Sequence, residues 1–247
     1  MATAASSIPA ETDLLCETCG YTLNGLPPEA NCPECGKPAS DSSPQTRSLP
    51  LWEKQRGLGI TGFMRTTAAV LFQPTKFYRT VITRAGRTSS RWFAAVHWAI
   101  VSVLFGIAAY FHFSWFLMMG NLPGSFARYD QPVLVILVLS IVTFALLIGT
   151  TRLAARLTSW EAAYRGYRLP FPVVLRGLDY HAAHYLPVAL IGAATVIGYH
   201  IALKHNWVSG YTGPLYLYTL CGEVLVAAAY LFWTYWIGMR NMMYANA

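Results

Sequence analysis

One apolar stretch, Trp92–Phe113, constrains this chain more than any other feature of its sequence. It reads WFAAVHWAIVSVLFGIAAYFHF, and its 22 residues include no Asp, Glu, Lys or Arg. As an α-helix it would be ~33 Å long, which is enough to cross a hydrocarbon core of ~30 Å. We therefore predict that this stretch is the first span of a membrane protein.

Three further apolar runs have comparable lengths of 19, 19 and 24 residues. Only 12% of the chain is charged, which is about half of what a soluble domain usually carries. A buried core helix could explain any one run, but four such runs in one chain favour membrane spans. We expect an all-α polytopic membrane protein with a four-helix transmembrane bundle in residues 92–247. The predicted spans are 92–113, 132–150, 185–203 and 215–238.

The first three spans each carry a pair of small residues four positions apart, a spacing that lets helix backbones approach closely in lipid. We expect these pairs to support a packed bundle. They are Ser102 with Gly106, Ala145 with Gly149, and Ala189 with Ala193.

The 18 Lys and Arg residues predict the topology. Ten precede the first span, and the successive loops and the tail then carry one, five, one and one. Cytoplasmic loops are the richer in Lys and Arg. We expect a multi-pass protein of the inner (cytoplasmic) membrane with both its N-terminus and its C-terminus in the cytoplasm. Because the net charge of +7 falls on these loops, we expect them to contact the anionic inner leaflet of the lipid bilayer, and we expect no nucleic acid partner.

Four cysteines near the N-terminus predict a metal site. Residues 16–36 read CETCGYTLNGLPPEANCPECG, so Cys16, Cys19, Cys32 and Cys35 form two Cys-x-x-Cys-Gly elements. Four thiolates make a closed tetrahedral site, which suits one structural Zn²⁺ per chain and leaves no open position for catalysis. Disulfides are the alternative, although a reducing cytoplasm disfavours them, and iron could occupy the same four sulfurs. We predict a zinc ribbon in residues 14–38.

The segments around this ribbon are predicted to be less structured. Residues 1–13 lack the pattern of a signal peptide, and we expect them to be disordered. Residues 39–62 begin as a Ser- and Pro-rich linker that should let the ribbon swing. Residues 63–91 read as a basic interfacial segment on the inner leaflet, with Phe77, Val81 and Ile82 on its apolar face. A re-entrant segment or a fifth crossing within residues 63–82 is the alternative.

The predicted cytoplasmic loop between the second and third spans contains a further amphipathic pattern. Leu153, Leu157, Trp160 and Tyr164 recur at helical spacing, which predicts a helical extension of the second span. The sequence LPFP at 169–172 should end this extension.

Two polar constellations are candidate sites. His181 and His184 would share one helical face and could hold a metal, although two interfacial histidines are the simpler interpretation. Glu223 is the only acid inside a predicted span, ~12 Å below its outer end, and His200 is its nearest predicted partner. An intramembrane acid is a functional candidate, and a protonated packing residue is the alternative. We expect four histidines to be anchors at span ends: His97, His112, His200 and His205.

Two resemblances complete the sequence evidence. The stretch CETCGYTLNGLPPEANCPECG resembles the rubredoxin-like zinc ribbons at the front of many bacterial membrane proteins. The stretches LFQPTKFYRTV and VLRGLDYHAAHYLP are similar to segments of bacterial relatives of the Ypt-interacting-protein (Yip) family. The second resemblance implies a multi-span helical bundle associated with membrane organisation or trafficking, and it implies no catalytic residues. That family usually has five spans, whereas we count four here.

Together these features favour a non-enzymatic membrane scaffold or adaptor of Yip-like type, whose cytoplasmic zinc ribbon docks a protein partner. A small-solute or ion transporter or channel using Glu223 is the second hypothesis, and at this size it would have to act as a homo-oligomer. A membrane-embedded enzyme using His181 and His184 is the third. The sequence has no phosphate-binding loop, nucleophile elbow or His-Glu-x-x-His helix, so an enzyme is the weakest of the three.

Overall fold

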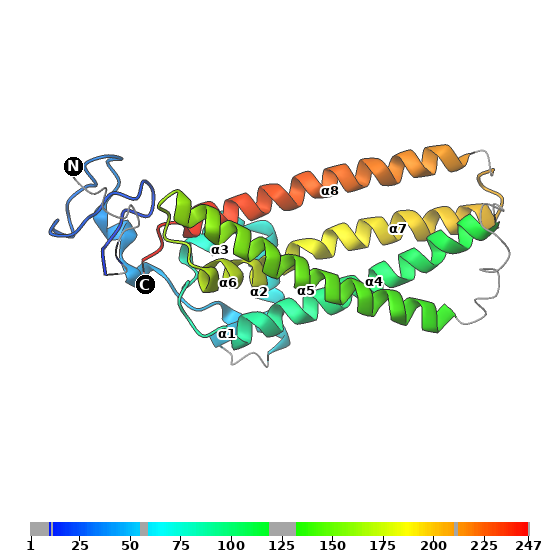
Figure 1. The fold of residues 1–247 in the computed structure, drawn as a ribbon, viewed down its shortest axis with the longest axis horizontal. Coiled ribbons are helices and arrows are strands. Elements are labelled where there is room, and N and C mark those ends of the chain that lie inside the picture. Colours follow the sequence, from blue (N-terminus) through cyan, green and yellow to red (C-terminus); the bar gives the residue numbers. More distant parts are fainter. Residues whose placement is uncertain (1–9, 11, 55–58, 119–131, 210–211, 247) are drawn as a thin grey trace. The chain divides into compact units, whose positions relative to one another are not determined.

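The computed structural model describes residues 10, 12–54, 59–118, 132–209 and 212–246 (Figure 1). These residues fold mainly as helices, and their only β-type pairings are isolated bridges. Three short helices precede the first long one. The α-helices are α1 (Leu51–Lys54), α2 (Ile60–Phe72), α3 (Pro74–Thr80), α4 (Thr88–Met118), α5 (Pro132–Tyr164), α6 (Phe171–His181), α7 (Tyr185–Lys204) and α8 (Gly213–Met242).

Four helical stretches are long and apolar enough to cross a membrane, as expected for a multi-pass membrane protein. The third combines α6, a 3-10 turn at Ala182–His184 and α7. The predicted four-helix composition is therefore confirmed. The helix α5 continues to Tyr164, as the amphipathic pattern after residue 150 predicts. The predicted apolar face of this extension is exposed, because Leu153, Leu157, Trp160 and Tyr164 are all solvent-accessible.

The chain divides into two compact units. The first, which we call the ribbon unit, comprises Met1–Ala94, Thr150–Ala183 and Trp233–Ala247. The second, the span unit, comprises Ala95–Gly149 and His184–Phe232. The helices α4, α5 and α8 contribute residues to both units.

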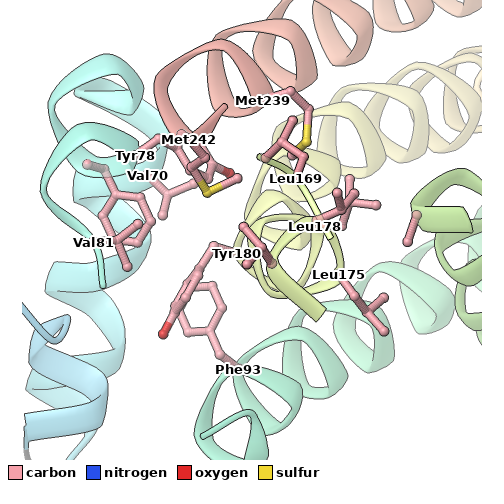
Figure 2. Close-up of a cluster of buried hydrophobic side chains, with 14 of the residues drawn as sticks. Val70, Tyr78, Val81, Phe93, Leu169, Leu175, Leu178, Tyr180, Met239 and Met242 are labelled. Atoms are coloured by element: carbon pink, nitrogen blue, oxygen red, sulfur yellow. The ribbon is translucent and has the colours of Figure 1, made fainter. Parts of the chain in front are cut away.

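The ribbon unit has an apolar core built around α6. Figure 2 shows side chains from α2, α3, α4, α6 and α8 gathered there, among them Val70, Tyr78, Phe93 and Met242. Tyr180 is fully buried in this cluster, and its ring lies 5.2 Å from that of Phe93. Every residue from Val173 to His184 is buried, so α6 is the central helix of the unit.

The segment predicted to lie on the inner leaflet differs from expectation. It forms α2 and α3, which meet at Gln73 because Pro74 cannot continue the hydrogen bonding of the first helix. The predicted lipid-facing residues Phe77 and Val81 are buried in the core of the ribbon unit. The apolar side chains exposed here instead belong to Ile60, Met64 and Phe72 of α2. At 13 residues, α2 would be ~20 Å long and is too short to be a fifth span.

The described part of the predicted linker is also ordered. It contains two 3-10 turns, Ala39–Ser42 and Pro44–Thr46, followed by α1. Trp52 on α1 is buried, and its indole nitrogen donates to the backbone oxygen of Ser89 at 2.7 Å. These contacts do not fit the expectation of a swinging tether.

The span unit brings α4 and α5 into close contact at Gly106. A Cβ atom built on this glycine would lie 2.3 Å from Ser140 Oγ and 2.7 Å from the backbone oxygen of Ile136. The Ser102 and Gly106 pair thus marks a close approach of two helices, whereas a Cβ on Gly149 would meet nothing within 4 Å. His97 is fully buried, so its predicted role as an interfacial anchor is wrong.

Candidate functional site

The two Cys-x-x-Cys-Gly elements fold into matching turns. The N–H of Gly20 donates to the backbone oxygen of Cys16 at 2.8 Å, and that of Gly36 donates to Cys32 at 2.9 Å. Both glycines have positive φ, 83° and 70°, a conformation that strains a residue with a Cβ. The turns therefore explain why glycine follows the second cysteine of each element.

These turns bring the four predicted ligands together. All four sulfur atoms lie within 4.8 Å of one another, and Cys16 Sγ is 3.5 Å from Cys35 Sγ. Four thiolates at ~2.3 Å from a tetrahedral metal would have their sulfurs ~3.8 Å apart, whereas a disulfide requires ~2.0 Å. All four cysteines are free thiols. The arrangement fits a metal ion, and it is the only such cluster of His, Cys, Asp and Glu within the described ranges.

The backbone around the sulfurs favours thiolates. Burial disfavours the charged form of Cys16, but hydrogen bonds from the backbone of Thr18 and Cys19, together with neighbouring thiols, lower its pKa from 9.0 to about 7. Burial raises the pKa of Cys19, although the backbone of Tyr21 hydrogen-bonds to its sulfur and opposes this shift. The backbone of Lys37 likewise hydrogen-bonds to Cys35, whose pKa is nevertheless raised by burial and by the neighbouring thiols. Such N–H groups stabilise and orient metal-bound thiolates. The site therefore combines four ligands with the surrounding donors that a closed metal centre needs.

The cysteine-containing segment 14–38, which we call the ribbon after its predicted fold, is fastened to the rest of its unit by buried polar contacts. Arg47 donates through Nε and Nη2 to both carboxylate oxygens of Glu17, at 2.8 and 2.9 Å. These two side chains are only 1% and 6% exposed. The side-chain amide of Asn246, which follows α8, donates to the backbone oxygens of Leu15 and Ser42, both at 2.7 Å. In Figure 1 the blue N-terminal segment and the red end of the chain accordingly lie side by side.

A second polar cluster surrounds α6 in the ribbon unit. Arg176 pairs with Glu53 at 2.8 Å, with the two side chains 2% and 6% exposed. Asp179 accepts from Ser90 Oγ at 2.9 Å and from Arg87 at 3.1 Å. Sequence reasoning missed this cluster because Glu53 and Arg87 are distant along the chain. The one local signal was a pair of charges, Arg176 and Asp179, inside an otherwise apolar helix, where an unpaired charge is costly to bury.

The histidine pair has ordinary hydroxyl partners. His181 Nε2 lies 3.0 Å from Thr234 Oγ1, and His184 Nδ1 lies 2.8 Å from the hydroxyl of Tyr230. Both histidines are buried. Neither belongs to a metal-competent cluster among the residues that the structure describes.

Glu223 has a polar partner that sequence reasoning did not identify. Its Oε1 accepts a hydrogen bond from Thr195 on α7, and no hydrogen bond joins it to His200 among the described residues. The ring of His200 instead packs edge-on against Phe111, with ring centroids 4.9 Å apart. Glu223 Oε2 is enclosed and has no hydrogen-bond partner in the described part of the chain. A carboxyl group inside the span unit thus keeps one unused acceptor.

Comparisons with known proteins add no relative. No protein-family model matches the chain, and no curated protein or solved structure matches it.

Proposed function

We propose that the chain is a non-enzymatic scaffold or adaptor of the inner membrane, with a zinc ribbon that docks a protein partner on the cytoplasmic side. The observation that supports this most is the fastening of the ribbon by Arg47 and Asn246. A surface that is already ordered loses little conformational freedom when a partner binds, and so binds it more tightly. The resemblance to the Yip family supports a role in membrane organisation or trafficking.

The exposed face of the ribbon is acidic, which favours a protein partner with a basic surface. Residues 11–41 contain six acids and one base, Lys37, although the chain as a whole carries +7. Glu29 and Glu34 are exposed on the ribbon, next to the exposed Pro27, Pro28 and Pro33. Complementary charge speeds encounter and selects among partners.

Zinc is the metal that this proposal assigns to the four cysteines. A closed set of four thiolates suits structural Zn²⁺, which would supply most of the folding free energy of so small a segment. Metal analysis of the purified protein should give about one zinc per chain. A stoichiometric amount of iron instead would contradict this part of the proposal.

Copurification in mild detergent tests the adaptor role. We expect a stoichiometric protein partner to copurify with the wild type and to be lost from Cys32→Ser. The double variant Glu29→Lys/Glu34→Lys should weaken the complex, whereas Glu161→Lys, an exposed acid on α5, should leave it unchanged. A tightly bound small molecule without any protein partner would contradict the adaptor role.

The enclosed, unpartnered oxygen of Glu223 supports a second candidate, an ion or solute pathway in the span unit. The substitution Glu223→Gln keeps the hydrogen-bonding capacity but removes the ionisable group. If Glu223 binds a cation or relays a proton, the variant should remain monodisperse and lose transport in proteoliposomes. Unchanged transport would leave Glu223 as a packing residue.

A further inference from the structure

A pocket in the ribbon unit lies between the first cysteine turn and the end of α8. Its volume is about 350 Å³, which is within the usual range of small-ligand sites. Glu17 and Cys19 come from the ribbon, Arg79 comes from α3, and Arg240 comes from α8. Three aromatic residues complete the lining that matters here: Tyr167, Trp236 and Tyr244.

The charges in this pocket favour an anion. Both carboxylate oxygens of Glu17 are occupied by Arg47, and Oε1 also accepts the backbone N–H of Asn246 at 3.0 Å. Arg79 and Arg240, in contrast, form no hydrogen bond or ion pair with any other described residue. The pocket therefore holds two uncommitted guanidinium groups, one carboxylate that is already neutralised, and Cys19, whose sulfur belongs to the cysteine cluster. Guanidinium groups bind phosphate oxygens through paired, charge-assisted hydrogen bonds.

The tyrosines that line the pocket add two hydroxyl groups that can donate hydrogen bonds. The rings of Tyr167 and Tyr244 meet edge to face, with centroids 5.9 Å apart. Neither hydroxyl has a hydrogen-bond partner among the residues described, so each can donate to an anion. Trp236 is 47% exposed near the end of α8, the position at which tryptophan lies beside lipid headgroups in membrane proteins.

We propose that this pocket binds a phosphate-bearing anion, held by Arg79 and Arg240. The same chemistry is offered by the headgroup of an anionic phospholipid and by free phosphate. The end of a helix that is long and apolar enough to span a membrane is where phospholipid headgroups lie. This inference goes beyond the docking of a protein partner, because it assigns a small-molecule site to residues outside the exposed ribbon face.

Two matched double variants test the proposal. Arg79→Gln/Arg240→Gln removes both charges from the pocket. Arg65→Gln/Arg152→Gln removes two charges from exposed arginines of the ribbon unit that do not line the pocket. A general attraction of basic residues to anionic lipid would be weakened equally by both variants. A specific pocket would be weakened only by the first.

Binding is measured on the detergent-purified, metal-loaded protein. Native mass spectrometry follows dihexanoyl phosphatidylglycerol, with dihexanoyl phosphatidylcholine as the zwitterionic control, and equilibrium dialysis follows inorganic phosphate. We expect the pocket variant to bind the anionic probe more than about tenfold more weakly, and the control variant to change affinity less than about twofold. Tighter binding of the anionic lipid than of the zwitterionic lipid identifies a headgroup site. The same ranking of variants with inorganic phosphate alone identifies a free phosphate site.

A charge-preserving variant separates binding from folding. Arg79→Lys/Arg240→Lys keeps the positive charges but loses the paired donors, so its affinity should fall between those of the wild type and the glutamine variant. Metal content and monodispersity should match the wild type in all variants. The proposal is overturned if the wild type binds neither phosphate-bearing probe, or if the pocket and control variants lose affinity equally.

Discussion

The ribbon unit is distinguished by buried, paired charges, whereas the span unit is distinguished by long exposed apolar helix faces. The ribbon unit buries three arginines, Arg47, Arg168 and Arg176, and two of them face a carboxylate at 2.8 Å. The span unit leaves apolar side chains exposed along α5 and α8, such as Leu137, Ile141, Leu225 and Val226. Exposed apolar surface of this extent is stable only against lipid or another protein.

The two units obtain their stability from different sources. The ribbon unit depends on specific partners within the chain, namely ion pairs, a cysteine cluster and one aromatic core. The stability of the span unit depends on an apolar surrounding, because lipid tails can cover its exposed apolar side chains without any specific contact. Variants that remove a partner should therefore harm the ribbon unit most. Variants that change helix spacing should harm the span unit most.

Loss of one cysteine should have the largest effect. Cys32→Ser leaves three thiolates, so the ribbon should lose its metal and unfold, because metal binding contributes ~10–16 kcal/mol in comparable small metal domains. The four long helices should still insert, since insertion does not require the metal. Metal content and limited proteolysis report on the ribbon, and carbonate extraction reports on insertion. Loss of insertion would show that the two units are not independent.

Breaking the buried ion pair between Arg176 and Glu53 should have the second largest effect on stability. Arg176→Met leaves Glu53 buried opposite no cation and should cost ~3–5 kcal/mol of stability. The double variant Glu53→Gln/Arg176→Met should recover much of this loss. The exposed pair of Arg165 and Glu161 is the control, with side chains 56% and 61% exposed. Thermal denaturation in detergent should show a change of less than ~1 kcal/mol for Arg165→Met. Equal losses at both pairs would refute the distinction.

Two glycines of the ribbon test how closely it packs against Tyr244 after α8. Gly20 and Gly25 have nearly equal positive φ, 83° and 82°, but only at Gly20 would a Cβ collide, 2.6 Å from the ring of Tyr244. Both alanine variants suffer backbone strain of ~1–2 kcal/mol. Gly20→Ala should lose ~1–3 kcal/mol more through overpacking. Denaturation of the ribbon, followed by metal release to a chelator, measures the difference. Identical release rates would argue against a firm contact with Tyr244.

The smallest effect is expected in the span unit. Gly106→Ala should push α4 away from α5 and cost ~1–3 kcal/mol. Gly149→Ala, where a Cβ meets nothing within 4 Å, should be neutral or slightly stabilising because alanine is the better helix former. Unfolding in mixed detergent micelles compares the two. A larger loss at Gly149 would mean that α5 makes its close contact elsewhere.

Sequence reasoning succeeded where the signal is local. Each span is one continuous apolar run, and Cys16 to Cys35 lie within 19 positions of one another. It failed where partners are far apart. Arg176 and Glu53 are separated by 123 positions and Asp179 and Arg87 by 92, so no local pattern indicated either pairing. The linker was misjudged for the same reason, because the buried partner of Arg47 is Glu17, 30 positions earlier.

The hydrogen bond between Asn246 and Leu15 can form only when synthesis of the chain is almost finished. The two residues are 231 positions apart. At ~5–20 residues per second, Asn246 is therefore synthesised ~10–50 s after Leu15. During that interval the cysteines of the ribbon can already bind metal, because all four lie near the N-terminus. The nascent ribbon can therefore fold around a metal before the end of α8 is synthesised. Until Asn246 is synthesised, the backbone oxygens of Leu15 and Ser42, which its side chain covers in the finished protein, remain open to solvent.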